Sequence, residues 1–169
     1  ELQQRTAEVE DALRKQEASA EILGVISSSV DDIRPVFGVI LTNAKQLCDA
    51  PMAALVLGRE GDSHQTLAAH QGVSEATRAF YAEGRVPMDP ARSFTARAIL
   101  SRRSVHLEDM ADTDEYRAGV PNVVGIVERQ GIRTNLFVPL VSGGEGIGAL
   151  ILFRQEVRPF TPDQIALVE

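Results

Sequence analysis

The sequence predicts an α+β fold, in which a central antiparallel sheet of about five to six strands is flanked by helices. Three observations predict it. Strand-like apolar segments occur in pairs that are joined by glycine-containing turns, as in antiparallel hairpins. Amphipathic segments with recognisable helix caps stand before, between and after these pairs. A chain of 169 residues with 44% hydrophobic residues is long enough for one such domain and an additional element.

The first expected element is a long amphipathic helix, because no glycine or proline occurs before Gly24. One stripe of this helix repeats at a spacing of four and three residues, which keeps it facing a partner helix. Its apolar members, which we expect to form a parallel homodimer, are Leu2, Val9, Leu13, Ala20 and Leu23. The polar stripe residues Thr6 and Gln16 favour the alternative, a solvated helix lying on its own domain. The predicted domains are a signalling and dimerisation helix over residues 1–31 and a sensor domain over residues 32–169.

The second helix and the first hairpin follow a polar break. Asp32 can cap a helix that accepts Pro35 in its first turn and ends near Asp49. The apolar residues of this helix share one stripe, so we expect it to pack on the sheet. Residues 52–57 and 65–70 then have the composition of two strands connected by a glycine turn.

Two shorter helices and a short strand occupy the middle of the chain. Ser74 can cap a helix that ends near Gly84, and Ser93 can cap a second helix over residues 94–101. Residues 105–108 predict a short strand after this second helix.

The second half of the chain should complete the sheet. Residues 109–121 are polar and are expected to be irregular, whereas residues 122–130 predict a helix that Gly131 ends. Residues 133–141 and 145–153 predict two strands that are joined by a tight glycine turn.

The last predicted element is a helix with a strong start signal. Thr161 stands three residues before Gln164, with Pro162 between them, which is a capping box with proline at the first helical position. The amphipathic pattern still runs at Glu169, so we expect the helix to be truncated there and to add to the dimer contact.

Composition excludes several classes of function. A net charge of −7 does not favour binding to nucleic-acid backbones, so no nucleic-acid partner is expected. The single cysteine, Cys48, cannot form an intrachain disulfide, and no Cys and His spacing matches a zinc site. No apolar run reaches the roughly 20 residues of a membrane-spanning helix. We therefore expect a cytoplasmic domain without direct membrane contact or a bound metal.

Five segments in this order carry a family resemblance. They are residues 93–100, 103–109, 131–140, 146–150 and 158–164. Together they resemble the GAF domain family, and the order of elements from about residue 32 agrees with that fold. The resemblance implies a GAF-like regulatory domain of the kind found in bacterial sensor histidine kinases and nucleotide cyclases.

The resemblance also implies a pocket between the sheet and residues 78–99, covered by residues 109–130. The expected ligand-binding residues are Phe80, Tyr81, Arg85, Ser93, Phe94, Thr95, Arg97, His106, Arg133 and Asn135. Further apolar walls are expected at Val86, Ile99, Val124, Ile126, Val127, Leu136 and Val138. Two arginines that converge on such a cavity would favour a carboxylate or a phosphate.

This sequence lacks the residues that similar domains use for several specific kinds of ligand binding and catalysis. The Asn-Lys pair of cyclic-nucleotide sites is not formed, because Asn43 and Lys45 are not adjacent. A covalent bilin is not expected on Cys48, which comes early in the domain, and His106 is the best of three poor candidates for a haem ligand. Methionine-sulfoxide reductases of this fold use several cysteines, whereas this chain has one. No cofactor and no catalytic residue is therefore predicted.

The leading hypothesis from the sequence is a regulatory small-molecule sensor within a multidomain bacterial signalling protein, with a sensor histidine kinase as parent. In this hypothesis an unidentified small ligand orders residues 109–130 and biases the terminal helices of a dimer. The alternatives are a ligand-free dimerisation and signal-relay module, and the GAF domain of a nucleotide cyclase.

Overall fold

A computed structural model of the protein describes residues 8–17 and 33–169. Residues 8–17 form a helix in which Val9 and Leu13 are 58% and 50% exposed. The other predicted seam residues, Leu2, Ala20 and Leu23, lie outside the described residues. A helix is thus present in the middle of the predicted signalling helix, and the homodimer stays a prediction.

The centre of the domain is a five-stranded sheet in the order β2-β1-β5-β4-β3. Every pair of neighbouring strands is antiparallel, which confirms the predicted fold class. The strands are β1 (Met52–Leu57), β2 (Thr66–Gln71), β3 (Val105–Leu107), β4 (Thr134–Ser142) and β5 (Glu145–Arg154). Both hairpins form as expected, because glycine turns join β1 to β2 and β4 to β5.

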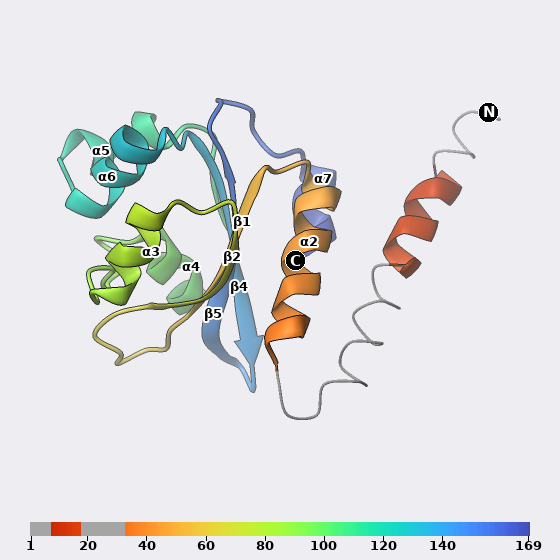
Figure 1. Ribbon diagram of the computed structural model, residues 1–169, viewed down its shortest axis with the longest axis horizontal. Coiled ribbons are helices and arrows are strands. Elements are labelled where there is room, and N and C mark those ends of the chain that lie inside the picture. The colour runs from red at the N-terminus through yellow and green to blue at the C-terminus, as the bar shows by residue number, and fades with distance from the viewer. Residues whose placement is uncertain (1–7, 18–32) are drawn as a thin grey trace.

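Helices cover both faces of the sheet, as Figure 1 shows. One face, which we call the α2 face, carries α2 (Arg34–Cys48) and α7 (Pro162–Val168). The opposite face, which we call the α6 face, carries α3 (Glu75–Ala82), α4 (Phe94–Ser101), the 3-10 turn η1 (Met110–Asp112), α5 (Asp114–Arg117) and α6 (Pro121–Gln130). Among the described helices, none combines the length and the apolar character that a membrane crossing requires.

Two apolar cores follow from the alternation of side chains along the strands. On the α2 face, Leu41 and Cys48 of α2 pack against strand residues such as Leu55 and Leu152. On the α6 face, Phe94 of α4 packs in a second cluster of buried side chains. Consecutive residues of β1, β4 and β5 therefore belong to different cores.

A buried arginine fastens the end of α2 to the segment before α7. Arg154, at the end of β5, is 1% exposed and donates hydrogen bonds to the carbonyls of Cys48 (2.6 Å), Asp49 (3.3 Å) and Pro159 (3.2 Å). Its guanidinium also stacks on the Phe160 ring at 3.9 Å. These contacts satisfy carbonyls at the C-terminal end of α2, which have no partner within the helix.

Most expected caps are confirmed, and two local expectations are corrected. Ser74 and Ser93 cap their helices, and Thr161 forms the capping box. The cap of α2 is Ile33 rather than Asp32, and it makes no side-chain capping hydrogen bond. The irregular segment expected at 109–121 contains the two short helical turns η1 and α5 and the first residue of α6.

The reason for this second correction is local. Asp109 accepts a hydrogen bond from the Ala111 amide at 3.0 Å, and Thr113 accepts one from the Tyr116 amide at 3.2 Å. Side-chain oxygens at these positions stabilise the first turn of a helix. Both cap signals are present in the sequence.

Candidate ligand site on the α6 face

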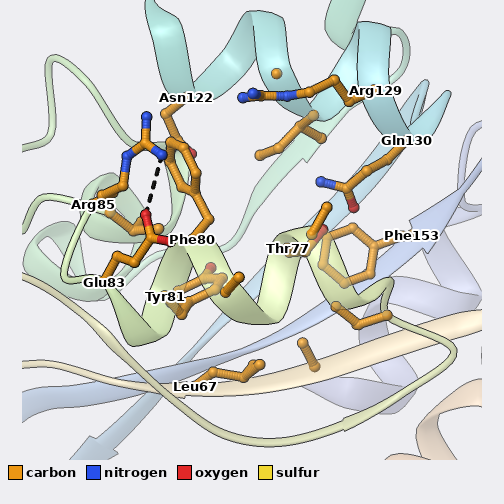
Figure 2. A pocket seen from close by; sticks show the side chains of 17 residues that line it. Leu67, Thr77, Phe80, Tyr81, Glu83, Arg85, Asn122, Arg129, Gln130 and Phe153 are labelled. Carbon is orange, nitrogen blue, oxygen red and sulfur yellow. Dashed lines mark hydrogen bonds and ion pairs between the residues drawn. The ribbon is translucent and has the colours of Figure 1, made fainter.

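A cavity of about 140 Å³ opens between α3, α6 and the sheet, as Figure 2 shows. Its floor is formed by Ala54 of β1, Leu67 of β2 and Phe153 of β5. The floor is apolar because these residues project from the α6 face of the three strands. The cavity therefore lies directly on the central sheet.

Helix periodicity explains why α3 and α6 present side chains to the same space. Thr77, Phe80 and Tyr81 of α3 are three and four residues apart, so they share one face of that helix. Asn122, Ile126 and Arg129 of α6 follow the same rule. The complete lining is Ala54, Leu67, Val73, Ala76, Thr77, Ala79, Phe80, Tyr81, Glu83, Arg85, Val86, Asn122, Gly125, Ile126, Arg129, Gln130 and Phe153.

Two arginines lie at the rim around one aromatic ring. The guanidinium of Arg85 is 4.3 Å from the centroid of the Phe80 ring, and that of Arg129 is 5.6 Å from it. In Figure 2 the ring lies between them. Arg85 also forms an ion pair with Glu83 at 3.2 Å. The rim thus combines cations with an aromatic platform, an arrangement that is favourable in itself.

Three of the predicted ligand residues line this cavity: Phe80, Tyr81 and Arg85. The predicted wall residues Val86 and Ile126 line it as well. Burial raises the pKa of the Tyr81 phenol well above its usual value, an effect that the Thr95 hydroxyl partly offsets. The phenol is therefore neutral and contributes an apolar surface with one polar end.

The predicted residues at the start of α4 are buried parts of the scaffold. The Ser93 hydroxyl accepts hydrogen bonds from the Ala96 amide (3.2 Å) and the Gln65 side chain (2.8 Å). Phe94 packs against Phe137 with a centroid distance of 6.1 Å. Neither these two residues nor Thr95 lines the cavity, because the cap turns them into the core.

Arg97 and Arg133, both expected as ligand contacts, are occupied by carboxylates. Arg97 pairs with Glu115 at 2.6 Å, and Arg133 makes a two-pronged contact with Asp109 at 2.6 and 2.8 Å. Hydrogen bonds from these guanidinium groups lower the pKa of both carboxyl groups. The two arginines therefore hold the segment from η1 to α5 in place, outside the cavity.

The structure corrects the expected position of His106. Val105 and Leu107 of β3 face the α6 core, so His106 between them faces the α2 side. Its Nε2 accepts a hydrogen bond from the Phe160 amide at 3.1 Å, and burial lowers its pKa. Nε2 is therefore unprotonated, and the imidazole supports the segment before α7.

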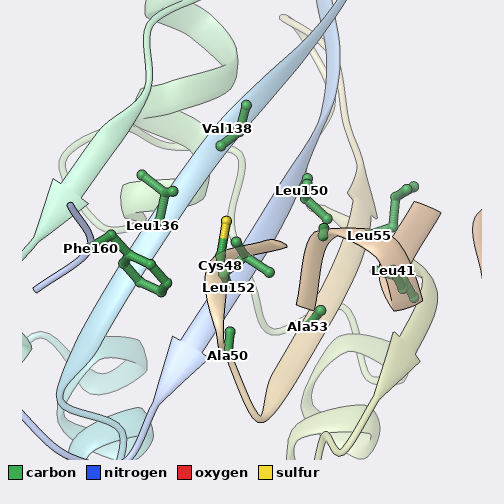
Figure 3. Close-up of a cluster of buried hydrophobic side chains, with 11 residues drawn as sticks. Leu41, Cys48, Ala50, Ala53, Leu55, Leu136, Val138, Leu150, Leu152 and Phe160 are labelled. Carbon is green, nitrogen blue, oxygen red and sulfur yellow. The ribbon is translucent and has the colours of Figure 1, made fainter. Parts of the chain in front are cut away.

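The predicted wall residues Leu136 and Val138 also belong to the α2 face, where Figure 3 shows them around Cys48. Burial raises the pKa of the Cys48 thiol to about 11. The thiol donates a hydrogen bond to the Gln164 carbonyl at 3.4 Å. Cys48 therefore packs as a small apolar residue and lies across the sheet from the cavity.

Asn135 is the remaining predicted residue, and its side chain has an unusual environment. It is 0% exposed, yet neither its amide nitrogen nor its amide oxygen has a hydrogen-bond partner in the described part of the chain. It pairs across the sheet with Leu107 and Phe153, both of which pack in the α6 core. Asn135 thus lies one strand beyond the cavity floor without lining the cavity.

Sequence reasoning missed the contribution of α6 to the rim, namely Asn122, Arg129 and Gln130. A signal was available, because Asn122 and Arg129 are seven residues apart on the predicted helix and share a face. Among the described residues, no group of three or more His, Cys, Asp or Glu side chains could hold a metal ion.

Comparisons with known proteins agree on one family. The profile of the GAF domain family, described as "GAF domain", matches residues 30–169. No curated protein matches the sequence significantly.

Several solved structures are similar to this fold. A domain from Sinorhizobium meliloti 1021, in a protein described as a two-component sensor histidine kinase, is 19% identical with a TM-score of 0.62, covering 81% of this chain and 83% of that one. The GAF domain of a phosphoenolpyruvate-protein phosphotransferase from Coxiella burnetii is 13% identical with a TM-score of 0.65, covering 92% and 86%. A free methionine-R-sulfoxide reductase from Neisseria meningitidis is 18% identical with a TM-score of 0.65, covering 90% and 80%. At such identities the likeness concerns the fold.

Proposed function

The chain belongs to the GAF domain family, and we propose that it is the regulatory small-molecule sensor of a larger bacterial signal-transduction protein. The observation that carries this proposal is the cavity on the α6 face. A sensor histidine kinase is the proposed parent, in keeping with the similar domain from a protein so described. The proposed location is cytoplasmic, and the domain is proposed to have no catalytic activity of its own.

The cavity has the composition that small-molecule sites share. An apolar floor and walls surround the space, and a few polar groups stand at the rim, where they can orient a ligand. Its volume of about 140 Å³ admits a compact molecule. A larger ligand would have to displace α3 or α6, so ligand size and helix position are coupled.

The path from the cavity to the end of α2 and to the segment before α7 is short in this fold. Phe153 lines the cavity, and the next residue of β5, Arg154, binds the end of α2 and the segment before α7. A full switch between two states needs a differential affinity of about 5.5 kcal/mol, so the ligand has to contact elements that move. We propose that α3 and α6 are the elements that move, and that β5, which carries Phe153 and Arg154 on opposite faces, transmits a shift to the other side of the sheet.

The proposed output is a parallel homodimer that forms through the predicted signalling segment of residues 1–31, with an added contact from α7. Val9 and Leu13 are exposed and lie one helical turn apart. Glutamate at both positions should produce monomers in analytical ultracentrifugation, whereas Ala12→Glu, outside the seam, should leave the dimer intact. Dimers that persist in the double variant would move the interface to the globular part.

A thermal-shift screen of the protein tests the sensor proposal. The panel contains cyclic nucleotides, purines, aromatic acids, dicarboxylic acids, haem and bilins. One class should raise the apparent stability saturably, by about 2.7 kcal/mol at 100 times its dissociation constant. Ala76→Phe places a ring at the cavity mouth and should abolish the response, while Ala82→Phe places the same ring on α3 outside the cavity and should not.

The second candidate function is a ligand-free relay, and the buried clamp around Arg154 is the observation that favours it. A relay predicts no response across the panel and unchanged signalling in Ala76→Phe. A further alternative is that the parent protein is a nucleotide cyclase and not a histidine kinase. The two parents differ in their output domain, so the enzymatic activity of the parent protein distinguishes them.

A further inference from the structure

The charged residues that line the cavity are two arginines and one glutamate, Arg85, Arg129 and Glu83, which leaves one net positive charge. Glu83 and Arg85 form an ion pair at 3.2 Å. Among the described residues, no carboxylate lies within ion-pair distance of Arg129. Its guanidinium lies over the Phe80 ring instead. The cavity therefore has one cation at its rim whose charge the described residues do not neutralise.

Gly125 of α6 leaves space for this cation beside the cavity. The Arg129 guanidinium folds back along the helix against Gly125, with its Cζ and Nε atoms 3.0 and 3.2 Å from the position that a Cβ would occupy. A methyl group at residue 125 would overlap the guanidinium, which would have to move. A glycine inside a helix is destabilising relative to alanine. Its benefit at this position is the room it leaves for Arg129.

Two neutral amides stand beside the cation on the same helix. Asn122 and Gln130 line the cavity, and their side chains have no hydrogen-bond partner among the described residues. Figure 2 shows the Gln130 amide directed towards the cavity. A ligand with an anionic group at the rim would find hydrogen-bond donors from α6 next to it.

The interior of the cavity favours a flat apolar body. Phe80, Phe153 and Leu67 contribute aromatic and aliphatic surfaces. The volume of about 140 Å³ is close to that of the engineered cavity of about 150 Å³ that binds benzene in another protein. One six-membered ring fits this space, whereas a nucleotide adds a sugar and a phosphate to a larger base.

The geometry points to a small aromatic monocarboxylate as the ligand class of this cavity, with its carboxylate on Arg129 and its ring between Phe80 and the sheet. This inference rests on the proposed function, because it takes the cavity to be the sensor site. An arginine guanidinium binds a carboxylate through two parallel hydrogen bonds, which gives both affinity and orientation.

The test compares three molecules of nearly equal shape and different charge: benzoate, benzamide and benzamidine. Titrations followed by NMR of the whole chain should show that benzoate binds at least about tenfold tighter than benzamide, since a hydrogen bond to a charged group contributes that much or more. Benzamidine, a cation, should bind most weakly. In Arg129→Gln the preference for benzoate should fall to about twofold or less, while Arg103→Gln, an exposed residue outside the cavity, should keep it.

A second variant retains the charge and changes only its position. Gly125→Ala should displace the guanidinium and reduce the preference for benzoate at least about threefold, while circular dichroism shows an intact helix. An unchanged preference in both Gly125→Ala and Arg129→Gln would overturn the role of Arg129.

The remaining outcomes separate the two proposals. Equal binding of benzoate and benzamide, or tighter binding of benzamidine, would overturn the ligand class and leave the cavity as a binding site. If none of the three binds and another molecule of the thermal-shift panel shifts the resonances of the cavity residues, the ligand class is overturned and the sensor function stands. If no molecule of either set shifts them, both proposals fail.

Discussion

The two faces of the sheet are packed to different standards. On the α2 face, Cys48 and Leu152 are 0% exposed, and the buried guanidinium of Arg154 is surrounded by carbonyl partners. On the α6 face there is a cavity of about 140 Å³, and the buried amide of Asn135 has no partner among the described residues. The same strands supply both faces, so the difference arises from what covers them.

The contrast suggests that the α2 face maintains the arrangement of the helices, whereas the α6 face is available for a ligand. The buried hydrogen bonds of Arg154 favour one arrangement of the end of α2 and the segment before α7, although the amide nitrogen of Asn43 in α2 has no partner among the described residues. Incomplete packing and an unsatisfied amide leave room and hydrogen-bonding capacity on the face of α3 and α6. The comparison predicts that substitutions on the α2 face act mainly on stability and those on the α6 face mainly on ligand response.

The largest effect is expected for Arg154→Met. The variant removes the hydrogen bonds that the guanidinium donates to the carbonyls of Cys48 and Asp49, and a hydrogen bond from a charged donor contributes about 1.5–3 kcal/mol. Each of these carbonyls keeps a second donor, Gln164 for Cys48 and Arg158 for Asp49, both at 3.2 Å. We expect the free energy of unfolding, measured with urea, to fall by about 3 kcal/mol. Arg103, which is exposed, should change it by less than about 1 kcal/mol when it is replaced in the same way. Similar stabilities of Arg154→Met and the unmodified protein would contradict a stabilising role for the hydrogen bonds of Arg154.

Neighbouring residues of β4 should respond with opposite signs. Asn135→Leu removes a buried amide without a partner and should stabilise the protein by about 1–2 kcal/mol. Thr134 is equally buried, but its hydroxyl donates to the Glu108 carbonyl (2.6 Å) and accepts from the Arg158 amide (3.0 Å). Thr134→Val should therefore destabilise by about 1–3 kcal/mol. Destabilisation by Asn135→Leu in urea titrations would show that the amide is satisfied in solution.

A smaller effect is expected from pH, through His106. Burial lowers its pKa, with Glu108 opposing and Arg154 adding to the shift. The pKa of His106 is lower in the folded state than in the unfolded state, where it is about 6.5. The contribution of His106 to stability is therefore complete above about pH 6.5 and is lost as the pH falls towards the folded-state pKa.

The melting temperature should accordingly decrease between about pH 6.5 and pH 5, and the decrease should be weaker in His106→Gln. The pKa of His70 is lowered as well, by burial and by Arg78, so the slope should decrease further when His70→Gln is added. An identical pH profile for the unmodified protein and His106→Gln would show that the hydrogen bond to the Phe160 amide does not persist.

The smallest expected effect is the absence of a reaction at Cys48. With its pKa raised to about 11 by burial, the thiol should not react with an aromatic disulfide reagent at pH 8 until urea unfolds the protein. A cysteine introduced on the α6 side as Ala82→Cys should react at once, since residue 82 is exposed. Rapid labelling of Cys48 in the native protein would mean that α2 or α7 opens. The two faces would then differ in how fast the reagent reaches them, and Cys48 would not be permanently protected.

The fold was largely predictable from local signals. Ser74, Ser93 and Thr161 each mark a helix start through a hydrogen bond within four residues of the chain. The turns of both hairpins contain glycines with positive φ, such as Gly61 and Gly143. Such features depend on sequence neighbours, and they are visible without knowledge of the tertiary structure.

The site was predicted less completely, because its residues are selected by distant partners. The predicted arginines Arg97 and Arg133 are engaged by Glu115 and Asp109, which are 18 and 24 residues away in the chain. Composition could indicate that arginines surround a pocket. Which of them remains available is decided by the carboxylates that the fold brings close.

The α+β class, the order of the elements, the amphipathic stripe at Val9 and Leu13 and the caps at Ser74, Ser93 and Thr161 follow from the sequence alone, because they depend on spacings of two to seven residues. The tertiary structure alone decided which side of the sheet each strand residue occupies, which placed His106 with α7 and Phe153 in the cavity. It also decided that Arg129 faces the cavity without a carboxylate partner among the described residues. The physical reason is that electrostatic neutralisation and packing depend on distances in space, which strand pairing sets between residues far apart in the chain.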